Sequence, residues 1–255
     1  MPEFRARYEF KYLITESQAD WIREVVRSFA DPDPYGDAGT YDVCSLYYDT
    51  WDWKLALQTV EGVRNRMKIR IRTYGFTPDM PVFLENKSRV GTSICKSRAL
   101  MHRKDWAPIS RSEPPPAEGY SAKVESHQEQ YDSIRNVFDL LDLRPRLWVM
   151  YQREAYGSSF GDGARLTFDR HLRVQAPDSE RLDEPDMDAF QRVKLDGAPT
   201  ILELKFNNAF PHWMHTIVHQ LGLRRVSCSK YVQGVEQLGD VPWNRVEWRE
   251  AWTVY

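Results

Sequence analysis

Residues 66–72 read Arg-Met-Lys-Ile-Arg-Ile-Arg, and this strict alternation limits the possible folds more than any other segment. Side chains along a strand point to opposite faces with a period of two. The segment therefore predicts a strand with one apolar and one basic face, the latter made of Arg66, Lys68, Arg70 and Arg72. Same-face neighbours lie roughly 7 Å apart, so at an effective dielectric of about 20 adjacent cations repel by roughly 2 kcal/mol. For this strand alone, a solvated sheet face and an anion-binding face both remain open.

The same pattern recurs along the chain, and each time it places Lys and Arg on one face with only a few acidic residues. These faces are Arg5, Arg7, Glu9 and Lys11; Glu85, Lys87 and Arg89; Tyr151 and Arg153; Arg165, Thr167 and Asp169; and Glu203 and Lys205. An ordinary antiparallel sheet also has one polar face, but its polar residues vary in type. If these strands form a barrel, the basic faces line a channel and the apolar faces pack outward against helices. Such a channel needs a bound polyanion or metal to offset its charge repulsion.

The periodicities as a whole predict an α+β fold, an antiparallel β-barrel or tunnel with flanking helices. Strands are expected near 4–13, 41–49, 63–74, 81–89, 92–103, 146–156, 163–171, 189–194 and 200–206. Helices are expected near 16–29, with Thr15 as N-cap, and near 52–59, 121–141, 210–221 and 229–238. The segment Asp31-Pro-Asp-Pro-Tyr-Gly predicts a loop. One domain is expected over 1–239, followed by a Trp-containing tail at 240–255 that either docks on the domain or anchors a partner.

Composition excludes several classes of protein. A chain of 255 residues with 42% hydrophobic content can bury a substantial core. Its net charge of −2 is unlike that of a basic nucleic-acid binder, so no nucleic acid is expected as partner. No stretch approaches the roughly 18–20 apolar residues of a membrane span, and the N-terminus lacks the apolar core of a signal peptide. Three widely spaced cysteines fit a reducing compartment, so a cytoplasmic protein is expected.

Eight short motifs occur in a fixed order on these strands. They are Tyr8-Glu-Phe-Lys-Tyr-Leu-Ile, Ser45-Leu-Tyr-Tyr-Asp-Thr, Lys68-Ile-Arg-Ile-Arg-Thr-Tyr-Gly, Leu84-Glu-Asn-Lys, Tyr151-Gln-Arg-Glu-Ala-Tyr, Arg165-Leu-Thr-Phe-Asp, Leu202-Glu-Leu-Lys-Phe and Ser229-Lys-Tyr. Together they resemble the VTC (vacuolar transporter chaperone) domain family, the polyphosphate polymerases among the CYTH-like triphosphate tunnel enzymes. The resemblance covers roughly residues 4–236, nearly the whole chain.

The resemblance implies a metal-dependent enzyme that passes the terminal phosphoryl group of ATP to a growing polyphosphate chain and releases ADP. Mn²⁺ or Mg²⁺ would be its cofactor, and ATP, triphosphate and polyphosphate its ligands. The catalytic cations would be Lys11, Arg70, Arg72, Lys87, Arg153, Lys205 and Lys230. Further phosphate contacts would come from Arg66, Lys68, Tyr151, Arg165 and Ser229. Glu203 would bind the metal, and Glu9 and Glu85 would either join it or orient basic side chains.

The chemistry suits these residue types. Phosphoryl transfer depends on positioning and on stabilising charge, and the Arg fork binds phosphate oxygens bidentately. Related tunnel triphosphatases often begin with Glu-x-Glu-x-Lys, whereas this chain has Arg7 at the first position, which lowers the odds of a two-metal triphosphatase. Where VTC domains often have a Lys, this chain has Ser227, so one channel contact is either lost or supplied by Arg224 or Arg225. A hydrolase of triphosphate or polyphosphate and a non-catalytic polyphosphate-binding module remain the alternatives.

Overall fold

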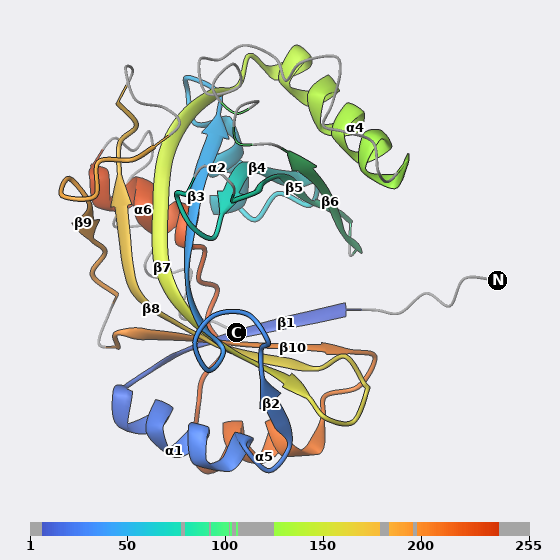
Figure 1. The fold of residues 1–255 in the computed structure, drawn as a ribbon, viewed down its shortest axis with the longest axis vertical. Coiled ribbons are helices and arrows are strands. Elements are labelled where there is room, and N and C mark those ends of the chain that lie inside the picture. The colour runs from blue at the N-terminus through green and yellow to red at the C-terminus, as the bar shows by residue number, and fades with distance from the viewer. Residues whose placement is uncertain are drawn as a thin grey trace.

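One antiparallel sheet runs through the residues that the computed structural model describes, which are 7–77, 80–91, 93–101, 103, 106, 125–178, 184–195 and 198–239. Its strands lie side by side in the order β1 (Arg7–Ile14), β10 (Thr200–Asn207), β8 (Arg165–Gln175), β7 (Arg144–Ser158), β3 (Thr40–Asp49), β4 (Arg66–Thr73), β5 (Val82–Val90) and β6 (Ser93–Met101). The sheet curls strongly, so that β1 and β10 face β4, β5 and β6 across a hollow (Figure 1). The predicted α+β fold, an antiparallel barrel or tunnel with flanking helices, is confirmed as a tunnel-like half-barrel, in which the described strands β1 and β6 end the sheet without pairing to each other.

Two short strands extend the sheet beyond this path. Strand β2 (Ala30–Pro32) pairs with β7, and β9 (Gln191–Arg192) pairs with β8. The loop predicted at 31–36 is wrong at its start, because Ala30 to Pro32 forms an edge strand, where proline is tolerated. Strand β9 is shorter than the segment predicted at 189–194.

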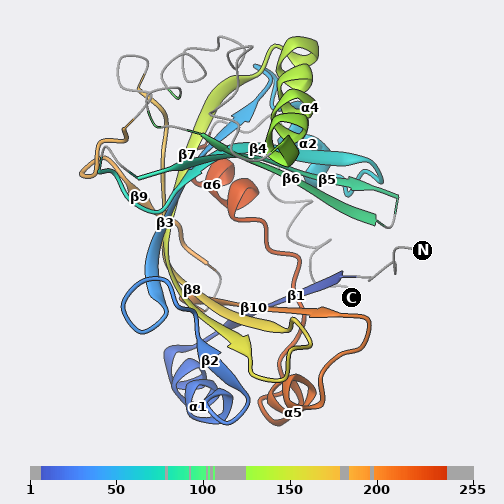
Figure 2. The ribbon, with the colours of Figure 1, turned by 45° about the vertical axis from the view of Figure 1, so that its right-hand side comes forward.

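The helices cover both halves of the curled sheet. Helices α1 (Glu16–Val26) and α5 (His212–Gln220) lie together beside β1, β8 and β10, and α4 (Glu125–Leu141) lies over β5 and β6 at the other end (Figures 1 and 2). Helix α2 (Lys54–Val60) packs on β4, and α6 (Lys230–Leu238) packs on β7, β8 and α2. The predicted cap of α1 is confirmed, because Thr15 and Gln18 exchange side chain to backbone hydrogen bonds.

Apolar side chains of the alternating strands form two clusters on the convex side of the sheet. Ile69 and Ile71 are fully buried in a cluster with residues of α4, such as Phe138. A second cluster joins α1 and α5 to Leu204 and its neighbours on β1, β8 and β10. Because burying such a side chain stabilises the fold by about 1.5–3 kcal/mol, the packing of these two clusters holds the opposite, polar faces toward the hollow. A third cluster, around Val43, lies under α6 on the same side of the sheet as the hollow, and Tyr47 and Tyr151 belong to it.

A bulge in β8 changes which of its side chains face the hollow. The register with β7 shifts between Met150 and Gln152, and β8 accommodates an extra residue there. His171 adopts a positive φ of 53° at this point. Before the bulge Asp169 faces the hollow, and after it Val174 does so, packed in the cluster under α6. The bulge therefore divides β8 into a polar half and an apolar half.

In the part of the chain that the structure describes, no helix is both long and apolar enough to span a membrane. The Trp-containing tail predicted at 240–255 lies outside the described residues.

Candidate functional site

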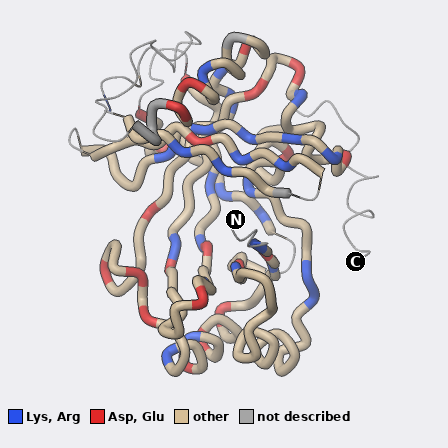
Figure 3. The backbone as a smooth tube through the Cα atoms, turned by 90° about the vertical axis from the view of Figure 1, so that its right-hand side faces the viewer, with Lys and Arg blue, Asp and Glu red and all other residues tan. Residues whose placement is uncertain are grey.

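A pocket of about 920 Å³ lies on the concave side of the sheet. Side chains from β1, β3, β4, β5, β7 and β10 line it, together with the end of α2 and the segment leading into α6. Eleven lining side chains are basic and three are acidic: Lys11, Arg66, Lys68, Arg70, Arg72, Lys87, Arg89, Arg153, Lys205, Arg225 and Lys230, against Glu9, Glu61 and Glu203. Figure 3 shows Lys and Arg recurring along the strands around the hollow. Such an excess of positive charge suits a polyanionic ligand.

The structure brings nearly all the sequence-predicted site residues to this pocket. The lining includes Lys11, Arg66, Lys68, Arg70, Arg72, Lys87, Tyr151, Arg153, Lys205, Ser229 and Lys230, and the predicted metal ligands Glu9 and Glu203. The predicted residues Arg165 and Glu85 do not line it.

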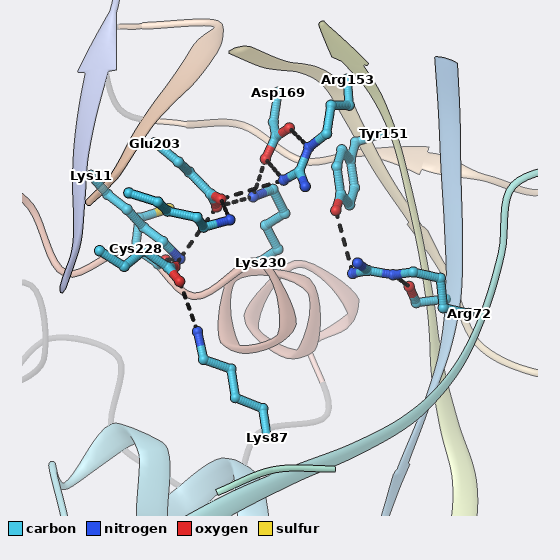
Figure 4. A network of polar contacts seen from close by, with 12 residues as sticks. Lys11, Arg72, Lys87, Tyr151, Arg153, Asp169, Glu203, Cys228 and Lys230 are labelled. Carbon is cyan, nitrogen blue, oxygen red and sulfur yellow. Dashed lines mark hydrogen bonds and ion pairs between the residues drawn. The ribbon is translucent and has the colours of Figure 1, made fainter. Parts of the chain in front are cut away.

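Glu203 lies at the centre of the cationic side chains. Its carboxylate is 2.7 Å from Lys230 Nζ, 2.9 Å from Lys205 Nζ, 3.3 Å from Arg153 Nη2 and 3.5 Å from Lys11 Nζ (Figure 4). Burial alone would raise the pKa of Glu203, but the surrounding cations hold it well below its usual value. Glu203 therefore stays ionised and keeps four cations close together in the absence of a ligand.

Asp169 is a second buried carboxylate. The alternation in 164–169 placed it on the polar face of its strand, but the sequence assigned it no function. Its side chain is 1% exposed and accepts hydrogen bonds from Arg153 Nε at 2.7 Å and Nη2 at 2.8 Å. Lys230 Nζ lies 2.5 Å from Asp169 Oδ2, the oxygen that also accepts from Arg153 Nη2 (Figure 4). Asp169 thus sets the orientation of two pocket-lining cations from behind them.

An ion pair joins β1 to β5 across the hollow. Lys87 Nζ on β5 lies 2.9 Å from Glu9 Oε2 on β1, and Lys11 Nζ lies 3.3 Å from Glu9 Oε1 (Figure 4). Among the described strands β1 pairs only with β10, so this contact is made by side chains rather than by the sheet. Although burial would raise the pKa of Glu9, Lys11, Lys205 and Lys87 hold it well below its ordinary value.

Two arginines of β4 are held by hydroxyl groups of β3 and β7. Arg70 donates from Nη1 to the Tyr47 hydroxyl at 2.7 Å. Arg72 donates from Nε to Ser45 Oγ at 3.2 Å and from Nη2 to the Tyr151 hydroxyl at 3.4 Å. Tyr47 lies on the predicted strand 41–49, but its role was missed because that strand shows no basic alternation.

The N-terminus of α6 also faces the pocket. Ser229 caps the helix by accepting from the Val232 N–H, and Ser227, Cys228 and Ser229 line the pocket next to Lys230. The Cys228 carbonyl accepts a hydrogen bond of 2.8 Å from Lys11 Nζ. A helix N-terminus carries partial positive charge, so it adds to the attraction for an anion.

Lys68 is the lining cation with the least favourable surroundings. Within the described residues it makes no ion pair, and its register partner on β5 is Lys87. Burial and the neighbouring charges of Lys11, Lys87 and Arg66 hold its pKa well below the ordinary value for lysine. A bound anion would relieve this repulsion.

Three positions correct or refine the expectations from sequence. Arg165 pairs with Asp33 and does not line the pocket, so its phosphate contact stays a prediction. Glu85, a predicted metal ligand, is 1% exposed and enclosed by basic side chains. Of the two arginines proposed to replace a missing lysine, Arg225 lines the pocket, with its guanidinium 4.9 Å from the centre of the Phe10 ring. Alternation along a strand predicts which face of the sheet a side chain lies on, but not whether it lies within the pocket. This explains why Arg165 and Glu85 do not line the pocket.

The carboxylates that line the pocket fit a divalent metal in company with phosphate. Among the described residues no group of three or more His, Cys, Asp and Glu side chains could hold a metal by itself. Glu9 and Glu203 both line the pocket, and Lys11 Nζ lies within 3.5 Å of each. Mg²⁺ often takes only one or two protein carboxylates when substrate phosphates supply further oxygens. Glu203 and Glu9 therefore suit a metal that enters with its phosphate ligand and displaces lysine contacts.

Comparison with known proteins gives distant structural matches and a family match. No curated protein matches the chain. A solved protein from Pyrococcus horikoshii OT3 is 13% identical, with a TM-score of 0.47 and coverage of 91% of this chain and 99% of that one. HpAC1 from Hippeastrum, described as a candidate adenylyl cyclase with a dominant triphosphatase activity, is 15% identical, with a TM-score of 0.49 and coverage of 92% and 96%. The VTC domain model matches residues 6–239, and the chain therefore belongs to the VTC domain family.

Proposed function

We propose that the protein is a cytoplasmic, metal-dependent polyphosphate polymerase that transfers the γ-phosphoryl group of ATP to a growing polyphosphate chain. The observation that carries this proposal is the pocket, which is lined by eleven basic side chains, four of them within 3.5 Å of the ionised Glu203. Membership of the VTC domain family supports a phosphate-containing ligand. Such a lining favours a chain of linked phosphates over a single small anion, because its charges extend along several strands.

In the proposed reaction a terminal phosphate oxygen of the polymer attacks the γ-phosphorus of ATP. A new P–O bond forms there while the bond to the β-phosphate bridging oxygen breaks, and ADP leaves with that electron pair. The attacking oxygen is already ionised, so no general base is required. The reaction then depends on holding two anions in line and on stabilising the charge of the transferring group.

The lining residues divide these tasks. Arg70, Arg72 and Arg153 present planar forks for the phosphate oxygens, whereas Lys11 and Lys230 supply point charges beside Glu203. A divalent metal bound by Glu203 and Glu9 would neutralise charge on the β- and γ-phosphates. Tyr151 orients Arg72, and Asp169 orients Arg153 and Lys230.

The test is to incubate the purified protein with ATP and Mn²⁺ or Mg²⁺ and to measure ADP, free phosphate and polyphosphate together. The proposal predicts that ADP appears with an equivalent amount of polymer-bound phosphate. The Arg72→Ala variant should lose at least about 100-fold in rate, because stabilisation of the transition state by one positioned donor is typically worth that much. Arg27→Ala is the matched control, since Arg27 lies on the exposed end of α1 and pairs only with Glu24 in the described structure.

Free phosphate equivalent to ADP, without polymer, would contradict the polymerase and indicate a hydrolase. Tight binding of polyphosphate with no release of ADP under either metal would indicate a non-catalytic binding module.

A further inference from the structure

Glu85 lies in the wall behind the pocket and in direct register between two arginines. It pairs with Arg70 on β4 and with Arg98 on β6. Its carboxylate lies 2.7 Å from Arg70 Nη2, 3.0 Å from Lys96 Nζ and 3.3 Å from Arg98 Nε. Arg72 Nε lies further away, at 3.9 Å. One buried carboxylate thus balances four cations.

This arrangement argues against a metal at Glu85. The side chain is 1% exposed and does not line the pocket. Oε2 is taken by Arg70, and Oε1 faces Lys96 and Arg98. A divalent cation at either oxygen would have to displace a buried cation and would meet the others at close range. Glu203 differs because it lines the pocket, where phosphate oxygens would complete the coordination.

Arg70 is held from two sides. Its Nε donates to Glu85 Oε2 at 2.8 Å, and its Nη1 donates to the Tyr47 hydroxyl at 2.7 Å. The Tyr47 ring stacks on Tyr231 with ring centres 4.6 Å apart. The Tyr231 hydroxyl donates to the buried Asp49 at 2.6 Å, and Asp49 also accepts from backbone N–H groups at the start of α2. The Tyr47 anchor is therefore fixed by the packing of α6 and α2, and the Glu85 anchor by the sheet.

We propose that Glu85, together with Tyr47, is a positioning residue that fixes the Arg70 fork toward the phosphate ligand. The proposal rests on the proposed phosphate-transfer function of the pocket. Arg70 remains the group that touches the ligand, and Glu85 acts only through it. A fork that is held before the ligand arrives loses little freedom on binding and keeps its alignment during transfer.

The proposal predicts that Glu85→Gln lowers turnover without weakening binding. In Glu85→Gln the wall loses one negative charge, so the dissociation constant for tripolyphosphate should stay unchanged or fall. The Arg70 fork loses an anchor, so kcat should fall by roughly 10–100-fold, the usual cost of a misplacement of about 1 Å. A loss of pocket integrity would instead weaken binding and turnover together.

Tyr47→Phe is a second variant that removes the other anchor without changing charge. It should lower kcat with little change in KM, and the double variant should lose less than the product of the two single losses, because both act through Arg70. Calorimetry with tripolyphosphate and steady-state kinetics with ATP supply the readings. Full kcat in Glu85→Gln, or recovery of its activity at high Mn²⁺, would overturn the proposal, the latter because it indicates a metal ligand.

An NMR measurement that does not depend on activity tests the role of Glu85 independently of the proposed function. Nitrogen-15 NMR resolves arginine Nε–H groups, and the Arg70 signal is identified by its loss in Arg70→Lys. We expect a slowly exchanging Arg70 Nε–H signal in the wild-type protein and its broadening or loss in Glu85→Gln. If the wild type turns over no phosphoanhydride, the proposed function fails while this reading still decides the role of Glu85. A signal that persists unchanged in Glu85→Gln would overturn it.

Discussion

At the scale of single residues, the pocket is a basic wall stabilised by a few buried carboxylates. Glu203 and Asp169 are both held in the ionised form, because the cations around them outweigh the cost of burial. Each carboxylate serves several cations: Lys230 contacts both, and so does Arg153. Removing one carboxylate therefore leaves buried positive charge that the remaining one must balance.

Asp169→Asn should lower the free energy of unfolding by about 3 kcal/mol, because breaking a buried ion pair on one side leaves an uncompensated charge. Urea unfolding at neutral pH measures the change. Asp20→Asn is the control, since the Asp20 carboxylate is 70% exposed and pairs with Arg23 on the helix surface. The control should stay within about 0.5 kcal/mol of the wild type. An Asp169→Asn variant as stable as the control would show that Glu203 alone balances Arg153 and Lys230.

Binding of a polyanion should be linked to proton uptake at Lys68. Its pKa is low in the empty pocket because of burial and of Lys11, Lys87 and Arg66, and a bound phosphate chain would raise it again. Protons are then taken up on binding, and affinity falls as the pH rises above the pKa of the empty pocket. Calorimetry with tripolyphosphate in two buffers of different ionisation enthalpy measures this uptake. Lys68→Met should reduce it, and an unchanged uptake would assign the proton to another group.

At the scale of secondary-structure elements, a buried ionic cluster joins α1 to the convex side of the sheet. Glu154 on β7 is 7% exposed and accepts hydrogen bonds from Arg23 of α1 at 2.7 Å, Tyr156 at 2.7 Å and Arg170 at 2.6 Å. Burial raises the pKa of Glu154, but these three partners together lower it to about 2. The junction between α1 and the sheet therefore depends on an ionised carboxylate.

Glu154→Gln should cost about 3 kcal/mol near neutral pH, which is the free-energy equivalent of the lowered pKa. Because the pKa is lower in the folded state, the stabilisation is fully present above the unfolded value of 4.5 and is lost as the pH falls toward about 2. Unfolding of both proteins from pH 7 to pH 2 tests this. The two stabilities should converge at acid pH, and a constant difference would contradict an ionic origin.

The sequence predicts the helices and strands better than it predicts the contacts between them. Alternation in 66–72 places Ile69 and Ile71 against α4 and the basic side chains toward the pocket, as observed. The bulge at His171 could not be predicted, because an extra residue in β8 leaves no periodic signal of its own. For Glu85 the sequence left open a metal role or the orientation of basic side chains, because its surroundings depend on β6, which contributes Lys96 and Arg98 from a segment with less regular alternation.

At the scale of the whole molecule, positive charge is concentrated in the pocket, although the chain as a whole carries no excess of it. The chain has a net charge of −2, yet the pocket holds eleven basic and three acidic lining side chains. Curling brings β1 and β5 to opposite sides of one pocket, although they lie at distant places in the sheet, and Glu9 and Lys87 connect them. The sequence could predict which side chains share a face, but which faces meet across the hollow depends on the curvature of the whole sheet.

The most direct test of the account is a crystal structure of the protein with tripolyphosphate and Mn²⁺. We expect a phosphate chain in the pocket, with oxygens bonded to Arg70, Arg72 and Arg153, and an anomalous Mn²⁺ peak between this chain and Glu203. Arg165 should remain paired with Asp33, and no metal should lie at Glu85. A phosphate chain bound elsewhere on the protein, or a metal that is bound without Glu203, would contradict the proposed site.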